Sequence, residues 1–204
     1  AATAFIVDNT APTVVLAYTD GGSSNATGPY KSGDSVTVTA TFTETNAISG
    51  TPTLSLVAGT FTGGTLPTVT LALSTGTTYT GTFTIPAGNG TVTATVGATD
   101  TAGNTLSATG QTGFTIDNTA PTVVLAYSDG GSSNATGPYK SGDSVTVTAT
   151  FTETNAISGT PTLSLVAGTF TGGTLPTVTL ALSTGTTYTG TFTIPAGNGT
   201  VTAT

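Results

Sequence analysis

The chain has 204 residues, of which only 5% are charged, and its net charge is −7 with two basic residues, Lys31 and Lys140. It contains no Cys, His, Met or Trp, which excludes disulfides, thiol redox chemistry, zinc fingers and every His-dependent catalytic mechanism. The acidic balance argues against nucleic acid as a partner, and no stretch reaches the roughly 20 apolar residues of a membrane-spanning helix.

The chain contains an internal repeat. The hexapeptide Asp8–Thr13 returns as Asp117–Thr122, which gives a period of 109 residues (117 − 8). The two copies differ at one position up to the end of the chain, where Thr19 is replaced by Ser128. The sequence therefore predicts the end of a preceding repeat's last strand at 1–7, a first repeat at 8–116, and a second repeat at 117–204 that lacks its last strand. We expect both ends to be cut from a longer array.

Apolar residues alternate with Thr and Ser throughout each repeat, a period typical of half-buried antiparallel strands. Breaks rich in Gly, Pro and Asn separate the runs. Seven short strands in about 100 residues predict a two-sheet Greek-key sandwich, so the fold class expected is all-β, with tandem immunoglobulin-like domains. In chain order, the apolar positions of the predicted strands in the first repeat are Val14, Leu16 and Tyr18; Val36, Val38, Ala40 and Phe42; Leu54 and Leu56; Val69, Leu71 and Leu73; Tyr79, Phe83 and Ile85; Val92, Ala94, Val96 and Ala98; and Phe114 and Ile116.

The few acidic residues fall near strand ends. Asp8 precedes the first predicted strand, Glu44 follows the second and Asp100 follows the sixth, and an immunoglobulin-type topology places these three points at one end of the sandwich. Carboxylates gathered without basic partners repel one another, which favours a hard cation among them.

Calcium is the cation that these residues favour, because it takes six to eight oxygen ligands. At the joint between the repeats, Asp117, Glu153 and the side chain of Asn118 could supply such oxygens. The alternative is that the acids are ordinary turn formers, as Asp20 and Asp34 are expected to be in Asp-Gly-Gly and Gly-Asp-Ser.

Four motifs occur in order at domain spacing: the linker Asp-Asn-Thr-Ala-Pro-Thr, Tyr30–Val36, Phe42-Thr43-Glu44, and Ala98–Asn104. Together they resemble the bacterial Ig-like tandem repeats of large cell-surface adhesins and biofilm-associated proteins, over essentially the whole chain. The resemblance implies an extracellular, often calcium-rigidified stalk that holds a terminal binding domain away from the cell. It also implies that the cation ligands are Asp8 and Asp117, Glu44 and Glu153, and Asp100.

The function expected is that of a structural repeat in a stalk or fibre, on the surface of a bacterium or archaeon or secreted from it, with no enzymatic activity. Its expected partners are neighbouring repeats of the same chain. One alternative is a filament subunit, in which Ala4–Val7 of one chain supplies the missing strand of another. A second alternative is a carbohydrate- or ligand-binding module, for which Tyr30 and Phe61 are the candidate loop aromatics.

Overall fold

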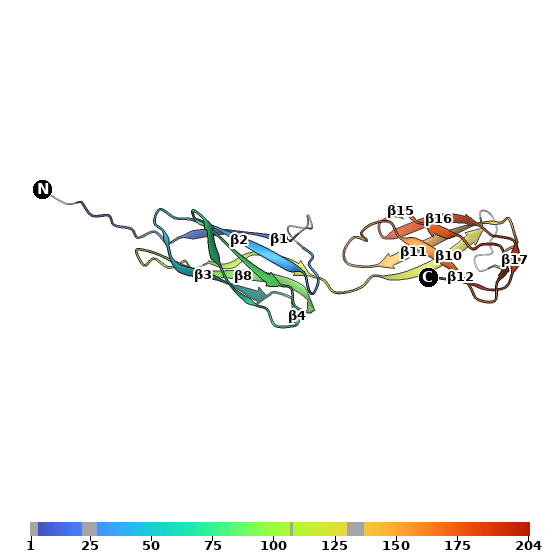
Figure 1. Cartoon of the computed structure of the whole chain (residues 1–204), viewed down its shortest axis with the longest axis horizontal. Helices are drawn as coiled ribbons and strands as arrows, with labels where there is room; N and C mark the ends of the chain where they lie inside the picture. Colours follow the sequence, from blue (N-terminus) through green and yellow to red (C-terminus); the bar gives the residue numbers. More distant parts are fainter. Residues whose placement is uncertain (1–3, 22–27, 107, 130–136) are drawn as a thin grey trace. The chain divides into compact units, whose positions relative to one another are not determined.

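The computed structural model describes residues 4–21, 28–106, 108–129 and 137–204 (Figure 1). The chain divides into two compact units, unit 1 at residues 1–119 and unit 2 at residues 120–204. In the described residues both units are built from antiparallel sheets without helices, as expected for an all-β protein. Accordingly, the described part of the chain has no helix that could cross a membrane.

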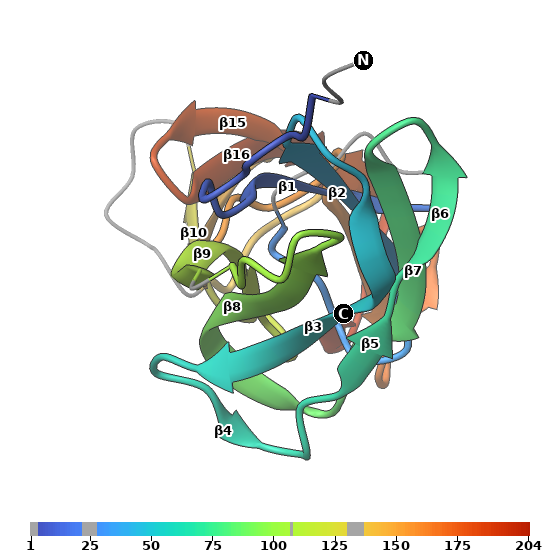
Figure 2. The same ribbon diagram turned by 90° about the vertical axis from the view of Figure 1, so that its left-hand side faces the viewer.

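The first sheet of unit 1 has the order β1-β2-β7-β6 (Figure 2). Its strands are β1 (Thr13–Asp20), β2 (Ser35–Thr43), β7 (Thr78–Thr84) and β6 (Ala72–Thr75). The predicted alternation is confirmed in β2, where Val36, Val38 and Ala40 are fully buried while the intervening Thr residues lie on the outer side. Thr suits this position because its branched side chain favours a strand and its hydroxyl stays in water.

The second sheet of unit 1 is centred on β8 (Gly88–Asp100), which pairs with β3 (Ile48–Ala58), β4 (Thr62–Gly63) and β9 (Ala108–Ile116). The short β5 (Thr68–Thr70) pairs with the other edge of β3. A continuous apolar core lies between this sheet and the first one.

The prediction of a single strand through Val69, Leu71 and Leu73 is wrong. β5 pairs with β3 in the second sheet, whereas β6 pairs with β7 in the first, so the chain changes sheets at Leu71. The Leu71 amide donates to the Pro52 carbonyl (2.9 Å) at this point. Because the crossing interrupts the alternation of faces, Val69 and Leu71 are buried but Leu73 is 60% exposed.

Aromatic side chains close one region of the unit 1 core. Phe114 of β9 lies against Tyr18, Tyr30 and Phe83, with ring centroids 5.1, 5.2 and 6.0 Å away. The Tyr18 hydroxyl donates to the Thr112 carbonyl (2.9 Å). Burial raises the pKa of Tyr18 above its usual value, and the neighbouring Tyr30 adds to this effect. β9 therefore completes the core as well as the sheet.

Unit 2 repeats much of this arrangement. Its first sheet has the order β10-β11-β16-β15, and its second face is built from β12, β14 and β18 with the short pair β13 and β17. Thr204 corresponds to Thr95, so the counterparts of Val96–Ile116 fall outside the 204 residues. The bounds are β10 (Thr122–Asp129), β11 (Ser144–Thr152), β12 (Thr162–Ala167), β13 (Thr171–Gly172), β14 (Thr177–Thr179), β15 (Ala181–Thr184), β16 (Thr187–Thr193), β17 (Gly197–Asn198) and β18 (Val201–Ala203).

Candidate metal centre

Three acidic residues of unit 1 converge at one end of the sandwich. Asp8 lies in the segment before β1, Glu44 directly follows β2, and Asp100 is the last residue of β8. One carboxylate oxygen from each lies within 4.8 Å of the others. Asp100 is 1% exposed, and Asp8 and Glu44 are half-buried. The structure thus brings together the three unit 1 residues that were singled out from sequence.

The loops hold two of these carboxylates in place. One oxygen of Asp8 accepts from the Thr10 amide (2.9 Å), and the other accepts from the side-chain amide of Asn46. Glu44 Oε1 accepts from the backbone amides of Thr45 (2.5 Å) and Asn46 (3.2 Å). The arrangement is preorganised, because most of these donors are backbone groups of the same turns.

Asn104 ties the third carboxylate to the first. Its backbone amide donates to Asp100 Oδ1 (2.8 Å), and its side-chain amide donates both to Asp100 Oδ2 (2.8 Å) and to the backbone carbonyl of Asp8 (3.2 Å). Neither Asn46 nor Asn104 was identified from sequence as a part of this site. The available signal was proximity in sequence, since Asn46 follows Glu44 closely and Asn104 ends the loop that begins at Asp100.

Electrostatics favour the charged form of Asp100. Burial opposes ionisation, but hydrogen bonds from the Asn104 side chain and from the backbone amides of Asn104, Gly103 and Ala102 outweigh it, so the pKa of Asp100 is lowered.

Lys31, the only basic residue of unit 1, precedes β2 while Glu44 follows it. The nine residues of β2 place them roughly 30 Å apart. No basic side chain among the described residues of unit 1 therefore lies close enough to neutralise this group.

Glu44 has one carboxylate oxygen whose charge no hydrogen bond compensates in the described structure. This atom, Oε2, is buried. Burying an unpaired carboxylate oxygen is costly unless another group compensates its charge. A cation bound between Asp8, Glu44 and Asp100 would do so, and three carboxylates in addition to nearby carbonyls suit the hard-oxygen preference of calcium.

The other predicted ligands are placed differently. Asp117 and Asn118 follow β9 and belong to unit 1, whereas Glu153 follows β11 in unit 2. Glu153 Oε1 accepts from the Thr154 amide (2.6 Å), as Glu44 does from Thr45, so the local turn is repeated. The position equivalent to Asp100 falls outside the 204 residues. A calcium site formed by Asp117, Asn118 and Glu153 stays a prediction.

Asn118 has a structural role that the sequence did not indicate. Its side-chain oxygen accepts from the Ser32 amide (2.6 Å), its side-chain amide donates to the Gly88 carbonyl, and its backbone amide donates to Asn89 Oδ1 (2.6 Å). The backbone amide of Asp117 donates to the Tyr30 carbonyl (2.8 Å). The outgoing segment is therefore fastened to the end of unit 1 opposite the acidic cluster.

Two further acids and the two candidate loop aromatics have structural roles in the described part of the chain. Asp34 Oδ2 accepts a hydrogen bond from the backbone amide of Lys31 (2.8 Å), and Asp143 Oδ2 accepts one from the backbone amide of Lys140 (2.9 Å). This geometry is typical of a turn. Tyr30 and Phe61, the candidate aromatics of a ligand-binding surface, are only 1% and 8% exposed. Both belong to the unit 1 core, so they give that alternative no support.

Comparison of the chain with protein-family models, with curated proteins and with solved structures finds no match.

Proposed function

We propose that this chain is a structural segment of an extracellular stalk or fibre of a bacterial or archaeal surface adhesin, rigidified by calcium and without enzymatic activity. One observation carries the proposal: the carboxylates of Asp8, Glu44 and Asp100 meet within 4.8 Å, and the buried Glu44 Oε2 lacks a partner in the described structure. Calcium is the group whose charge and coordination those oxygens match best.

The strand order supports the finer fold assignment to the immunoglobulin type. Constant-type immunoglobulin sandwiches join strands A, B, E and D in one sheet and C, F and G in the other. If β1, β2, β7 and β6 are A, B, E and D, then β3, β8 and β9 are C, F and G, with β5 added beside C. The neighbours in both sheets of unit 1 agree with this scheme.

The position of the cluster explains how a cation would serve a stalk. Asp8 belongs to the incoming segment, whereas Glu44 and Asp100 belong to the body of the sandwich. A cation held by all three would fix the direction in which the chain enters the unit. At the opposite end, Asn118 and Asp117 already fasten the outgoing segment through hydrogen bonds. With both segments fixed to its body, a unit would keep its neighbours in an array at a constant orientation.

Calcium binding tests the proposal directly. We expect calcium added to the chelator-treated chain to raise the Tm of unit 1. At a calcium concentration a hundred times the Kd, the free energy of unfolding should increase by about 2.7 kcal/mol. Magnesium should bind more weakly, because it requires a tighter octahedral shell.

The matched variants are Glu44→Gln, which keeps the size of the side chain but removes its charge, and Asp34→Asn at the opposite end of the unit. We expect Glu44→Gln to lose most of the calcium response and Asp34→Asn to retain it. The proposal fails if calorimetric titration shows no calcium binding, or if both variants respond like the parent.

A further inference from the structure

Tension on the chain would enter unit 1 through two edge strands. The incoming segment leads into β1, which pairs with β2 alone among the described strands, and the outgoing segment continues from β9. Thr13, the first residue of β1, pairs with Thr43, whereas Ile116, the last residue of β9, pairs with Gly90. These two pairs lie at opposite ends of unit 1, so a pull on both segments runs along the strands (Figure 1).

The direction of the pull determines how the hydrogen bonds break. Bonds between antiparallel strands lie perpendicular to the strands. A pull along a strand therefore loads all of its bonds together, whereas a pull across the strand opens them one at a time. The pairing of β1 with β2 is continuous from Thr13–Thr43 to Asp20–Val36. The pairing of β9 with β8 is interrupted twice, so β9 is the strand that needs further support against sliding.

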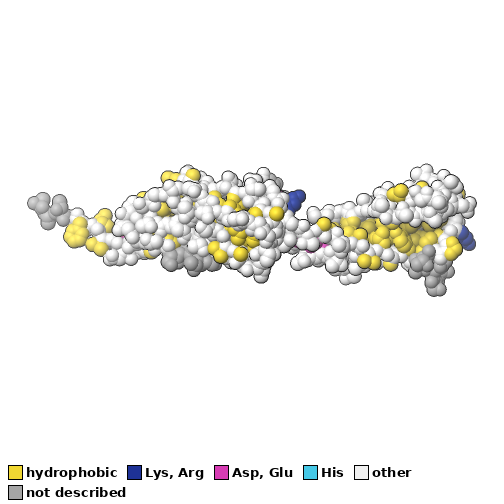
Figure 3. All heavy atoms as spheres, turned by 90° about the horizontal axis from the view of Figure 1, so that it is seen from below, with side chains coloured by type: hydrophobic (Ala, Val, Ile, Leu, Met, Phe, Trp, Pro, Cys, Tyr) yellow, Lys and Arg dark blue, Asp and Glu magenta, His cyan; other side chains and the backbone are white. Residues whose placement is uncertain are grey.

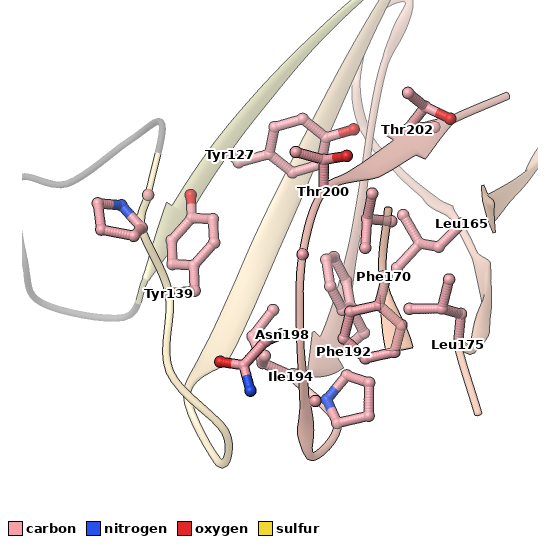
Figure 4. Close-up of a pocket in the computed structure, with 17 residues that line it drawn as sticks. Tyr127, Tyr139, Leu165, Phe170, Leu175, Phe192, Ile194, Asn198, Thr200 and Thr202 are labelled. Atoms are coloured by element: carbon pink, nitrogen blue, oxygen red, sulfur yellow. The ribbon is translucent and has the colours of Figure 1, made fainter. Parts of the chain in front are cut away.

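Phe114 fixes β9 in the core. Its ring contacts the rings of Tyr18, Tyr30 and Phe83, so β9 cannot slide unless this ring leaves the core. Unit 2 displays the face that β9 covers in unit 1, because the counterpart of β9 falls outside the 204 residues. Figure 3 shows apolar side chains gathered on one face of unit 2, and Figure 4 shows the apolar groove there. The groove residues that correspond to the three aromatic partners of Phe114 are Tyr127, Tyr139 and Phe192.

Gly113 provides a steric stop against sliding. A Cβ at this position would lie 1.7 Å from the carbonyl oxygen of Val92, closer than two atoms without a bond between them can approach. A pull on the outgoing segment moves each residue of β9 toward the place of the residue that follows it. The first residue to reach the place of Gly113 is Thr112, which has a Cβ. The close approach at Gly113 therefore opposes movement in the direction of the pull.

Hydrogen bonds on both sides of the outgoing segment oppose the same movement. On one side, the Tyr30 amide donates to the Thr115 carbonyl (2.9 Å), and the Asp117 amide donates to the Tyr30 carbonyl (2.8 Å). On the other side, the backbone amide of Asn118 donates to Asn89 Oδ1 (2.6 Å). These bonds hold the end of β9 between two neighbours, which compensates for its interrupted pairing with β8.

We propose that unit 1 is a tension-bearing element in which β9 is held against sliding, with Gly113 as the stop and Phe114 as the side chain that fixes the strand. The resistance depends on direction. A pull along β9 meets the stop, whereas a pull that lifts β9 away from β8 separates their pairs in turn.

This inference deepens the proposed stalk function, on which it rests for the source of the tension. It does not depend on a bound cation. Its tests are made in chelator, so that their failure can be distinguished from a failure of calcium binding.

The first test compares two directions of pull by single-molecule force spectroscopy. Because the chain has no cysteine, cysteines introduced at exposed positions give unique points of attachment. Thr10→Cys with Ala120→Cys pulls along β1 and β9, from positions that are exposed on either side of these strands. Ala87→Cys with Ala120→Cys pulls from the end of unit 1 where β8 begins and β9 ends, and lifts β9 away from β8. We expect unit 1 to yield at a several-fold higher force in the first variant than in the second.

The second test isolates the stop with two matched substitutions in β9. Thr112 and Thr115 are both exposed, and Gly weakens a strand at either position. Only Thr112 must pass the Val92 carbonyl when β9 slides. With attachment at positions 10 and 120, we expect Thr112→Gly to lower the force at which unit 1 yields, and Thr115→Gly to lower it less. With attachment at positions 87 and 120, the two variants should yield at similar forces, because no residue then has to pass the stop.

A measurement of stability separates the stop from a general weakening of unit 1. Thr112→Gly and Thr115→Gly should have similar free energies of unfolding in urea, whereas forced unfolding depends on the barrier along the path. The proposal is overturned if unit 1 yields at the same force in both directions of pull. It is also overturned if the two variants lower the force equally when the pull runs along the strands.

Discussion

The ring of Phe114 lies edge-on to the ring of Tyr18, with centroids 5.1 Å apart and ring planes at 71°. Phe114 also lies edge-on to Tyr30 at 5.2 Å and stacks on Phe83 at 6.0 Å. The last strand of unit 1 thus contributes one side chain that contacts three aromatic rings. Pairs of this kind stabilise a core beyond the area that they bury.

Truncating Phe114 should destabilise unit 1 strongly. Phe114→Ala leaves a cavity beneath β9, and we expect it to lower the free energy of unfolding by about 3–5 kcal/mol. Urea denaturation followed by tyrosine fluorescence measures this loss. The matched control is Phe5→Ala, where the same residue type is 85% exposed and the loss should be near zero. Similar losses in both variants would contradict the assignment of Phe114 to the core.

Asn118 and Asn9 form a second matched pair, because they occupy the same position in the two copies of the linker. Asn118→Ala removes the acceptor of the Ser32 amide and the donor to the Gly88 carbonyl. Because water can replace these partners at an exposed site, we expect a loss of only about 1 kcal/mol. Hydrogen exchange at Ser32 should accelerate in Asn118→Ala and stay unchanged in Asn9→Ala. Unchanged exchange in both would show that Asn118 does not fasten the linker.

Acid should destabilise unit 1 through Asp100. The pKa of Asp100 is lowered from its usual 3.8. The charged form is therefore favoured by folding, and its contribution is present above pH 3.8 and lost as the pH falls through the folded pKa. In chelator, we expect the Tm of unit 1 to decrease as the pH falls below 3.8. The Tm of Asp100→Asn should depend less on pH. Asp143→Asn, in unit 2, should leave the unit 1 transition unchanged. A steeper acid dependence in Asp100→Asn would reverse the proposed sign.

The period of the apolar residues was sufficient to predict the sheets but not their crossings. Val36, Val38 and Ala40 alternate with Thr, and the structure places them inside as the period requires. The change of sheet at Leu71 left no such signal, because Val69, Leu71 and Leu73 keep the same alternation on both sides of it. Only the pairing partners of β5 and β6, which lie far away in sequence, distinguish one long strand from two short ones.

The candidate metal site, too, could be predicted only in part from the sequence. The three acids could be placed at one end of the sandwich because strand order alone determines which ends meet. The hydrogen bonds of Asn104 to the Asp8 carbonyl, and of Asn118 to Ser32, join residues 96 and 86 positions apart. Contacts of that kind depend on the detailed path of the loops, which composition and periodicity do not encode.

The most direct test of the central claim is whether calcium fixes the incoming segment to the sandwich. Spin labels at Val7→Cys and Thr82→Cys would report the distance between that segment and β7. We predict that calcium narrows the distance distribution and that Glu44→Gln abolishes the narrowing. An equally broad distribution with and without calcium would contradict a cation-rigidified stalk.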